Sequence, residues 1–155
     1  MRVCGVEINA NDAVLCLLEL DRGLFDLPDC RVRKLSLPKE NTAEQLRQFQ
    51  FAFAKLMEDY KVQIVAIKER PLKGKFAGGA LGFKMEAAIQ LVDSLTVTML
   101  SPQAIKSVLA EYPLPLAFSD TGLKNFQEGA FLSAYAAHYI DKVATTDREG
   151  NNNRA

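Results

Sequence analysis

A chain of 155 residues is long enough for one domain with a buried core, and its 48% hydrophobic and 25% charged residues are typical of a globular protein. Nineteen basic side chains balance nineteen acidic ones, so any surface that attracts nucleic acid must be local. No apolar run approaches the roughly 20 residues of a membrane span, and we expect no signal peptide, because the N-terminus passes straight into a predicted strand. These features, with three cysteines that lack metal-ligand spacing, predict a cytoplasmic protein with reduced thiols and no membrane partner.

The first half of the chain predicts a hairpin, a third strand and a helix. Two apolar runs flank a stretch of turn residues, which indicates a β-hairpin, and a shorter, exposed strand follows after a loop. A capping-box pattern that begins at Asn41 and Thr42 then introduces apolar residues at helical spacing. In order, these elements span Met1–Ile8, Ala13–Leu20, Arg31–Leu35 and Ala43–Tyr60.

The second half alternates strands and helices. In order, it predicts the strand Val62–Glu69, the helix Gly79–Asp93, the strand Thr96–Leu100, a helix from Pro102 through Leu109, and a closing helix capped by Ser119–Thr121 that runs to about Val143. We expect one domain over residues 1–144. The polar residues 145–155 are expected to form a disordered tail.

The order of these elements predicts an α/β fold. Three meander strands followed by crossover units give a mixed five-stranded sheet with helices on both faces. The predicted strands lie in the order 3-2-1-4-5, with strand 2 antiparallel. That arrangement is the ribonuclease H-like fold.

Two glutamates each close an apolar strand: Glu7 in VCGVEI and Glu69 in VQIVAIKER. If these strands lie parallel and adjacent, both carboxylates reach the carboxyl edge of the sheet, where open α/β sheets bind ligands. Carboxylate oxygens are the ligands of hard cations, so the pair predicts a Mg²⁺ or Mn²⁺ site. Alternatively, Glu7 is an exposed strand-end acid, and Glu69 forms ion pairs with its neighbours Lys68 and Arg70.

The segment after the second of these strands is rich in glycine and basic residues. It reads KERPLKGKFAGGALGFK over residues 68–84 and does not fit the Walker pattern. Basic side chains here would follow a nucleic-acid backbone, and an aromatic ring would stack on bases. The predicted contacts are Arg70, Lys73, Lys75, Phe76 and Lys84. The alternative is a solvated crossover loop whose Phe76 and Phe83 pack inward.

From Met1 to about Asp141 the chain resembles the RuvC-like Holliday-junction resolvases, and it is closest to an uncharacterised bacterial family of unknown function. The resemblance is carried by VCGVEI, IKER, GALGFKMEAAIQLV, LSPQAIKSVL and GAFLSAYAAH. It implies a nuclease whose carboxylates hold two divalent ions, with Glu7 in the first position, usually Asp, and Glu69 in the second. The family's last two acids fall on Gln127 and Ala130 here, and Glu128 is adjacent to one of them.

Two functional hypotheses follow. In the first, the protein is a metal-dependent nuclease for branched DNA or RNA, with Glu7, Glu69 and Glu128 as metal ligands and catalytic residues. In the second, it is a catalytically degenerate module that binds nucleic acid or a protein partner. Phe51 lies off the main apolar stripe of its helix and is a candidate for a homodimer contact.

Overall fold

A computed structural model describes residues 1–74 and 78–143 of the protein. Its strands are β1 (Arg2–Asn9), β2 (Asp12–Asp21), β3 (Leu24–Asp26), β4 (Lys34–Ser36), β5 (Ile64–Lys68) and β6 (Thr96–Leu100). Its α-helices are α1 (Ala43–Asp59), α2 (Ala80–Gln90), α3 (Pro102–Glu111) and α4 (Glu128–Ala137). The predicted tail, residues 145–155, lies outside the described residues.

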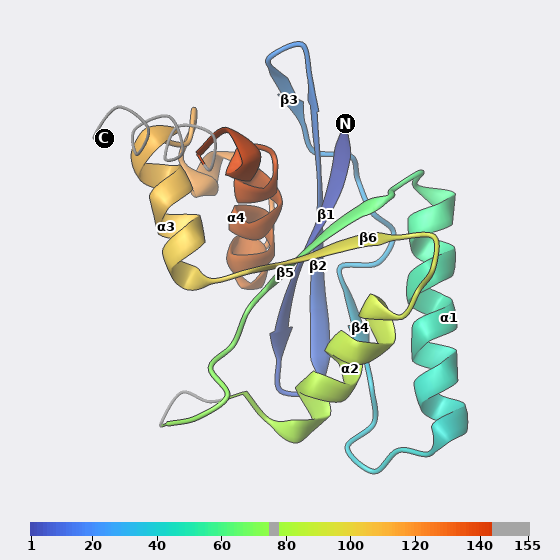
Figure 1. The fold of residues 1–155 in the computed structure, drawn as a ribbon. Helices are drawn as coiled ribbons and strands as arrows, with labels where there is room; N and C mark the ends of the chain where they lie inside the picture. Colours follow the sequence, from blue (N-terminus) through green and yellow to red (C-terminus); the bar gives the residue numbers. More distant parts are fainter. Residues whose placement is uncertain (75–77, 144–155) are drawn as a thin grey trace.

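The strands form one mixed sheet in the order β3-β2-β1-β5-β6 (Figure 1). β1 and β2 form an antiparallel hairpin that is paired over the whole length of β1. β5 lies parallel to β1 and β6 lies parallel to β5, as crossover connections through helices require. The predicted mixed sheet of the ribonuclease H-like fold is therefore confirmed, with strand one between strand two and the strand that precedes α2.

The sheet has six strands instead of the predicted five. Arg22 and Gly23, between β2 and β3, both have positive φ, 52° and 78°. Positive φ at both central residues is the geometry of a tight hairpin turn, so β3 folds back onto β2 within a stretch predicted to be a loop. The strand predicted at Arg31–Leu35 forms as β4, which pairs with the other end of β2.

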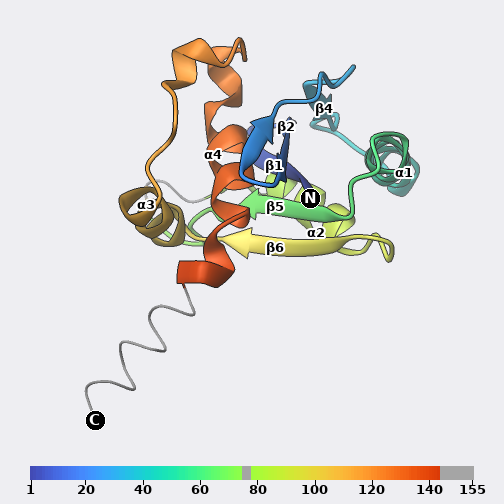
Figure 2. The same ribbon diagram turned by 90° about the horizontal axis from the view of Figure 1, so that it is seen from above.

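The helices lie in two layers with the sheet between them (Figures 1 and 2). α1 and α2 cover one face around Phe53 and Met85, and α3 and α4 cover the other around Val108 and Phe131. Side chains of β1 alternate between these layers, because successive residues of a strand point to opposite faces. Within the described residues, no helix is long and apolar enough to cross a membrane.

The closing helix begins later than predicted. Two short 3₁₀ turns, Phe118–Asp120 and Asn125–Gln127, precede α4. The Thr121 hydroxyl donates to the Phe118 carbonyl and accepts from the Leu123 amide, and Gly122 has a φ of 77°. These local bonds compete with helical ones, so the expected cap at Ser119–Thr121 forms a turn instead.

Candidate site at the carboxyl edge of the sheet

Glu7 lies near the end of β1, on the face covered by α4. Its Oε2 accepts a hydrogen bond from Lys68 Nζ at 3.0 Å, and the two side chains are 25% and 37% exposed. Gly129, in the first turn of α4, has no side chain where the carboxylate lies, and a Cβ there would overlap both carboxylate oxygens. The carboxylate therefore sits at the amino end of α4, where the helix dipole favours a negative charge.

The pairing of β1 with β5 explains why Lys68 reaches Glu7. Val6 is the register partner of Ile67 in this parallel pair. The residues that follow them, Glu7 on β1 and Lys68 on β5, therefore lie side by side. Both side chains point toward α4, because Val6 and Ile67 point into the opposite core. The lysine next to Glu69 is thus the residue that faces Glu7.

Glu69 follows the last residue of β5, and the same alternation directs it toward the α1 and α2 layer. Its side chain is exposed, and its backbone amide donates to the Leu100 carbonyl at 2.8 Å. Burial raises the pKa of Glu86 on α2, and the negative charge of Glu69 adds to that rise. Strand alternation therefore favours the layer of α1 and α2 for Glu69 and the layer of α4 for Glu7.

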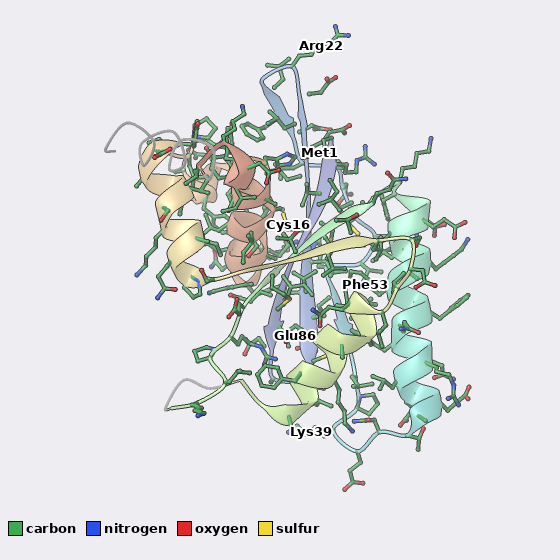
Figure 3. The ribbon with its side chains drawn as sticks, viewed as in Figure 1. Met1, Cys16, Arg22, Lys39, Phe53 and Glu86 are labelled. Atoms are coloured by element: carbon green, nitrogen blue, oxygen red, sulfur yellow. The ribbon has the colours of Figure 1, made fainter. Side chains whose placement is uncertain are left out.

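Arg70 is held inside the protein by α2. Its Nε and Nη2 both donate to Glu86 Oε1 at 3.3 Å, and its guanidinium lies 4.6 Å from the centre of the Phe83 ring. A Cβ on Gly82 would overlap the guanidinium, and one on Gly78 would lie 2.8 Å from it. Glu86 belongs to α2 (Figure 3). Burial raises the pKa of Glu86, while the charge of Arg70 acts against that rise.

The residues at the start of the closing helix have structural contacts. Gln127 is buried, its Nε2 donates to the Leu15 carbonyl at 3.0 Å, and its Oε1 accepts from the Lys124 amide at 3.0 Å. Ala130 is fully buried where α4 crosses β1. Glu128 is exposed. The two positions to which the resemblance assigns acids therefore fasten α4 to the sheet.

The remaining predicted contacts belong to the segment that leaves β5. Lys73 is exposed, and so is Lys84, whose Nζ lies 3.4 Å from Asn41 Oδ1. The Gly78 amide donates to the Pro71 carbonyl at 2.8 Å and closes the base of this loop. Lys75 and Phe76 lie outside the described residues.

The described part of the chain does not supply the donor set of a two-metal site. Within residues 1–74 and 78–143, no group of three or more His, Cys, Asp or Glu side chains is arranged to hold a metal ion. Glu7 already has a cationic partner in Lys68, and strand alternation favours the opposite face of the sheet for Glu69. The predicted Mg²⁺ or Mn²⁺ ion therefore does not fit these residues as they are arranged.

Sequence reasoning missed three residues of this edge: Lys68, Glu86 and Gly129. Lys68 could have been found by counting strand alternation back from Glu69, given the register of β1 and β5. Glu86 lies one helical turn after Gly82 on an otherwise apolar face of α2. A small residue next to an acid on such a face could have indicated that Glu86 is buried. The close approach of Gly129 to Glu7 depends on tertiary packing, which leaves no local pattern.

Comparison with known proteins gives a family and a fold. A family model described as a protein of unknown function (DUF3010) matches residues 1–137. No curated protein matches the sequence. RuvC from Thermus thermophilus is similar with a TM-score of 0.71 at 15% identity, over 94% of this chain and 98% of that one.

Two further solved structures share the fold. T. thermophilus RuvC in complex with a Holliday junction substrate gives a TM-score of 0.65 at 20% identity, over 92% of this chain and 96% of that one. The yeast mitochondrial Holliday junction resolvase gives a TM-score of 0.57 at 8% identity, over 96% of this chain and 81% of that one. At these identities the likeness establishes the RuvC-like, ribonuclease H-like fold.

Proposed function

The chain belongs to the family described as a protein of unknown function (DUF3010), and we propose that it is a RuvC-like module that binds branched DNA or RNA without cutting it. One observation carries the second half of this proposal. The charged partner of Glu7 is Lys68 and not a second acid, and strand alternation favours opposite faces of the sheet for Glu7 and Glu69. A two-metal clamp needs several carboxylates that converge on one point.

Nucleic acid is the favoured partner for two reasons. A solved structure that shares the fold over nearly the whole of both chains is a complex with a Holliday junction substrate. In this chain the exposed Lys73 lies in the loop that leaves the carboxyl end of β5, and the exposed Lys84 lies in α2, the helix that follows this loop. Because the net charge of the protein is zero, such a local basic surface is what would attract a phosphate backbone.

The test is binding of a four-way DNA junction, measured by fluorescence anisotropy in EDTA and in Mn²⁺ over a range of salt concentrations. We expect binding in both buffers, with affinity that falls steeply as salt rises. The double variant Lys73→Gln, Lys84→Gln should make the logarithmic salt slope shallower by up to about two. The matched control is Lys61→Gln, an exposed lysine at the opposite end of β5, which should leave the slope unchanged.

The same preparation tests the nuclease hypothesis. If Glu7, Glu69 and Glu128 hold Mg²⁺ or Mn²⁺ for cleavage, the wild type will cut the junction in Mn²⁺, and Glu7→Gln or Glu128→Gln will abolish cutting while binding persists. That result would overturn the proposal of a non-cleaving module. No binding to junction, duplex or single-stranded DNA or RNA at low salt would instead favour a protein-interaction module.

A further inference from the structure

We propose that the Lys68 ammonium is a built-in cation that takes the place of a divalent metal ion at Glu7 and binds one phosphate group of the nucleic acid. The phosphate rests on the proposed function. The cation does not, because it follows from the geometry of β1, β5 and α4. The two parts can therefore be tested separately.

The position of the ammonium is fixed by the sheet. Parallel pairing of Val6 with Ile67 makes Glu7 and Lys68 neighbours across the strands, and their charged atoms are 3.0 Å apart. A rigid, central strand pair holds this geometry more firmly than a loop would. A divalent ion bound to the same carboxylate oxygen would have to displace the ammonium, since two cations so close repel each other strongly.

Within residues 1–74 and 78–143, Glu7 belongs to no group of three or more acids, histidines or cysteines that could hold a metal ion. The first turn of α4 closes one side, where Gly129 approaches the carboxylate. Glu128 is exposed. The side-chain amide of Gln127 donates to the Leu15 carbonyl and accepts from the Lys124 amide. Lys68 is therefore the partner that neutralises Glu7 in the part of the chain that the structure describes.

Lys68 keeps capacity for a ligand. An ammonium group has three N–H donors, and its one described acceptor is Glu7 Oε2. The side chain is 37% exposed, so the remaining donors are open to an incoming acceptor. Arg70 cannot take this role, because its side chain is only 14% exposed and its guanidinium is paired with Glu86. A phosphate oxygen is the acceptor that a lysine binds as a point charge.

The first experiment measures Mn²⁺ binding without nucleic acid, from the loss of the free Mn²⁺ signal in electron paramagnetic resonance. Lys68→Glu puts a second carboxylate beside Glu7 on the same face of the sheet. We expect this variant to bind Mn²⁺ with a Kd at least about tenfold lower than that of the wild type. Lys68→Gln, which removes the charge and keeps a similar length, should fall between the two proteins.

Stability provides an independent readout of the same site. The two carboxylates of Lys68→Glu repel each other, so Mn²⁺ should raise the melting temperature of this variant and leave that of the wild type unchanged. Adding Glu7→Gln to Lys68→Glu should remove the effect. Equal Mn²⁺ affinity in the wild type, Lys68→Gln and Lys68→Glu would overturn the assignment of Lys68 as the cation of this site. Should Lys68→Glu not fold, the wild type and Lys68→Gln still decide it.

The second experiment tests the phosphate contact in EDTA. Lys68→Gln should make the salt slope of junction binding shallower by about one, as expected when one phosphate contact is lost. An unchanged slope would overturn the phosphate contact. If the wild type binds no nucleic acid, the proposed function and the phosphate contact both fail, whereas the Mn²⁺ experiment still decides whether Lys68 replaces a metal ion.

Discussion

At the scale of single residues, two glycines decide how closely α4 approaches the sheet. Gly5 lies on β1 beneath α4, where a Cβ would overlap the Ala130 carbonyl oxygen and lie 2.7 Å from the Ala134 nitrogen. Both contacts are with backbone, which cannot rotate away as a side chain can. The absence of a side chain at Gly5 therefore lets α4 pack directly on β1. The same close packing lets Gly129 approach Glu7.

Gly5→Ala should consequently destabilise the protein by at least about 2 kcal/mol, because α4 must move off the sheet to make room. Urea unfolding of the wild type and the variant measures this difference. The matched control is Gly79→Ala, since a Cβ at Gly79 meets nothing within 4 Å and its φ of −76° suits alanine. Similar stability of Gly5→Ala and the wild type would contradict the direct packing of α4 on β1.

His138 is a second residue whose environment has a measurable consequence. It is buried after the end of α4, its Nε2 lies 3.0 Å from the Leu18 carbonyl oxygen, and its Nδ1 has no hydrogen-bond partner among the described residues. Burial lowers the pKa of His138, and the amino-terminal charge of Met1 lowers it further. The hydrogen bond with the Leu18 carbonyl raises the pKa and so opposes these two effects. Nδ1 is therefore easier to bury unprotonated.

A lowered pKa in the folded state means that the unfolded chain binds the proton first. The contribution of His138 to stability is complete above its unfolded pKa of about 6.5 and is lost as the pH falls from there through the folded pKa. Urea unfolding between pH 8 and pH 5 should show a slope of up to about 1.4 kcal/mol per pH unit that is absent in His138→Gln. Parallel pH profiles for the two proteins would contradict this account.

At the scale of elements, the Arg70–Glu86 pair joins the end of β5 to α2. Both side chains are mostly buried, 14% and 8% exposed, so removing one partner leaves a charge without compensation. Arg70→Met should therefore cost about 3 kcal/mol of unfolding free energy. The double variant Arg70→Met, Glu86→Leu should cost less than Arg70→Met alone, which a double-mutant cycle by urea unfolding would detect. Additive losses would mean that the pair is not coupled.

Elements with a strong local signal were predicted correctly from the sequence. The capping box formed, with Thr42 and Gln45 bonded reciprocally, and β6 has the predicted bounds. β3 was missed because its turn depends on Arg22, a residue that rarely adopts positive φ. The start of α4 was misplaced because Thr121 and Gly122 form a local turn that competes with the helix.

The candidate site was harder to predict than the elements that carry it. The apolar runs predicted the two strands that end near Glu7 and Glu69, and the order of the elements predicted that these strands are adjacent, but the facing pair depends on a one-residue choice of register. The structure makes Lys68 the neighbour of Glu7 and turns Arg70 inward. Charge alone does not show whether a basic residue contacts solvent, a ligand or an internal acid.

At the scale of the whole molecule, one sheet separates two apolar cores. Strand residues alternate between them, so that Val65 packs in the core of α1 and α2 and Ala66 in that of α3 and α4. Neither layer can lose its helices without exposing one face of the same strands. The two cores should therefore unfold together, as small single domains usually do.

This cooperativity can be tested by weakening each core in turn. Phe53→Ala in the core of α1 and α2 should cost about 3–5 kcal/mol, and Gly5→Ala perturbs the opposite face. Each variant should keep a single urea transition that is the same by circular dichroism and by tyrosine fluorescence, with an unchanged m value. Separate transitions in either variant would show that the two layers unfold independently.

The Glu7–Lys68 pair also bears on how this surface can change over generations. The lysine codons AAA and AAG become the glutamate codons GAA and GAG through substitution of the first base alone. Because the register already aligns residues 7 and 68, that one substitution would exchange an ion pair for two facing carboxylates without any change in the backbone. A single nucleotide substitution therefore separates the ion pair from an arrangement that favours a metal ion, whether Lys68 changes to glutamate or a glutamate at this position changes to lysine.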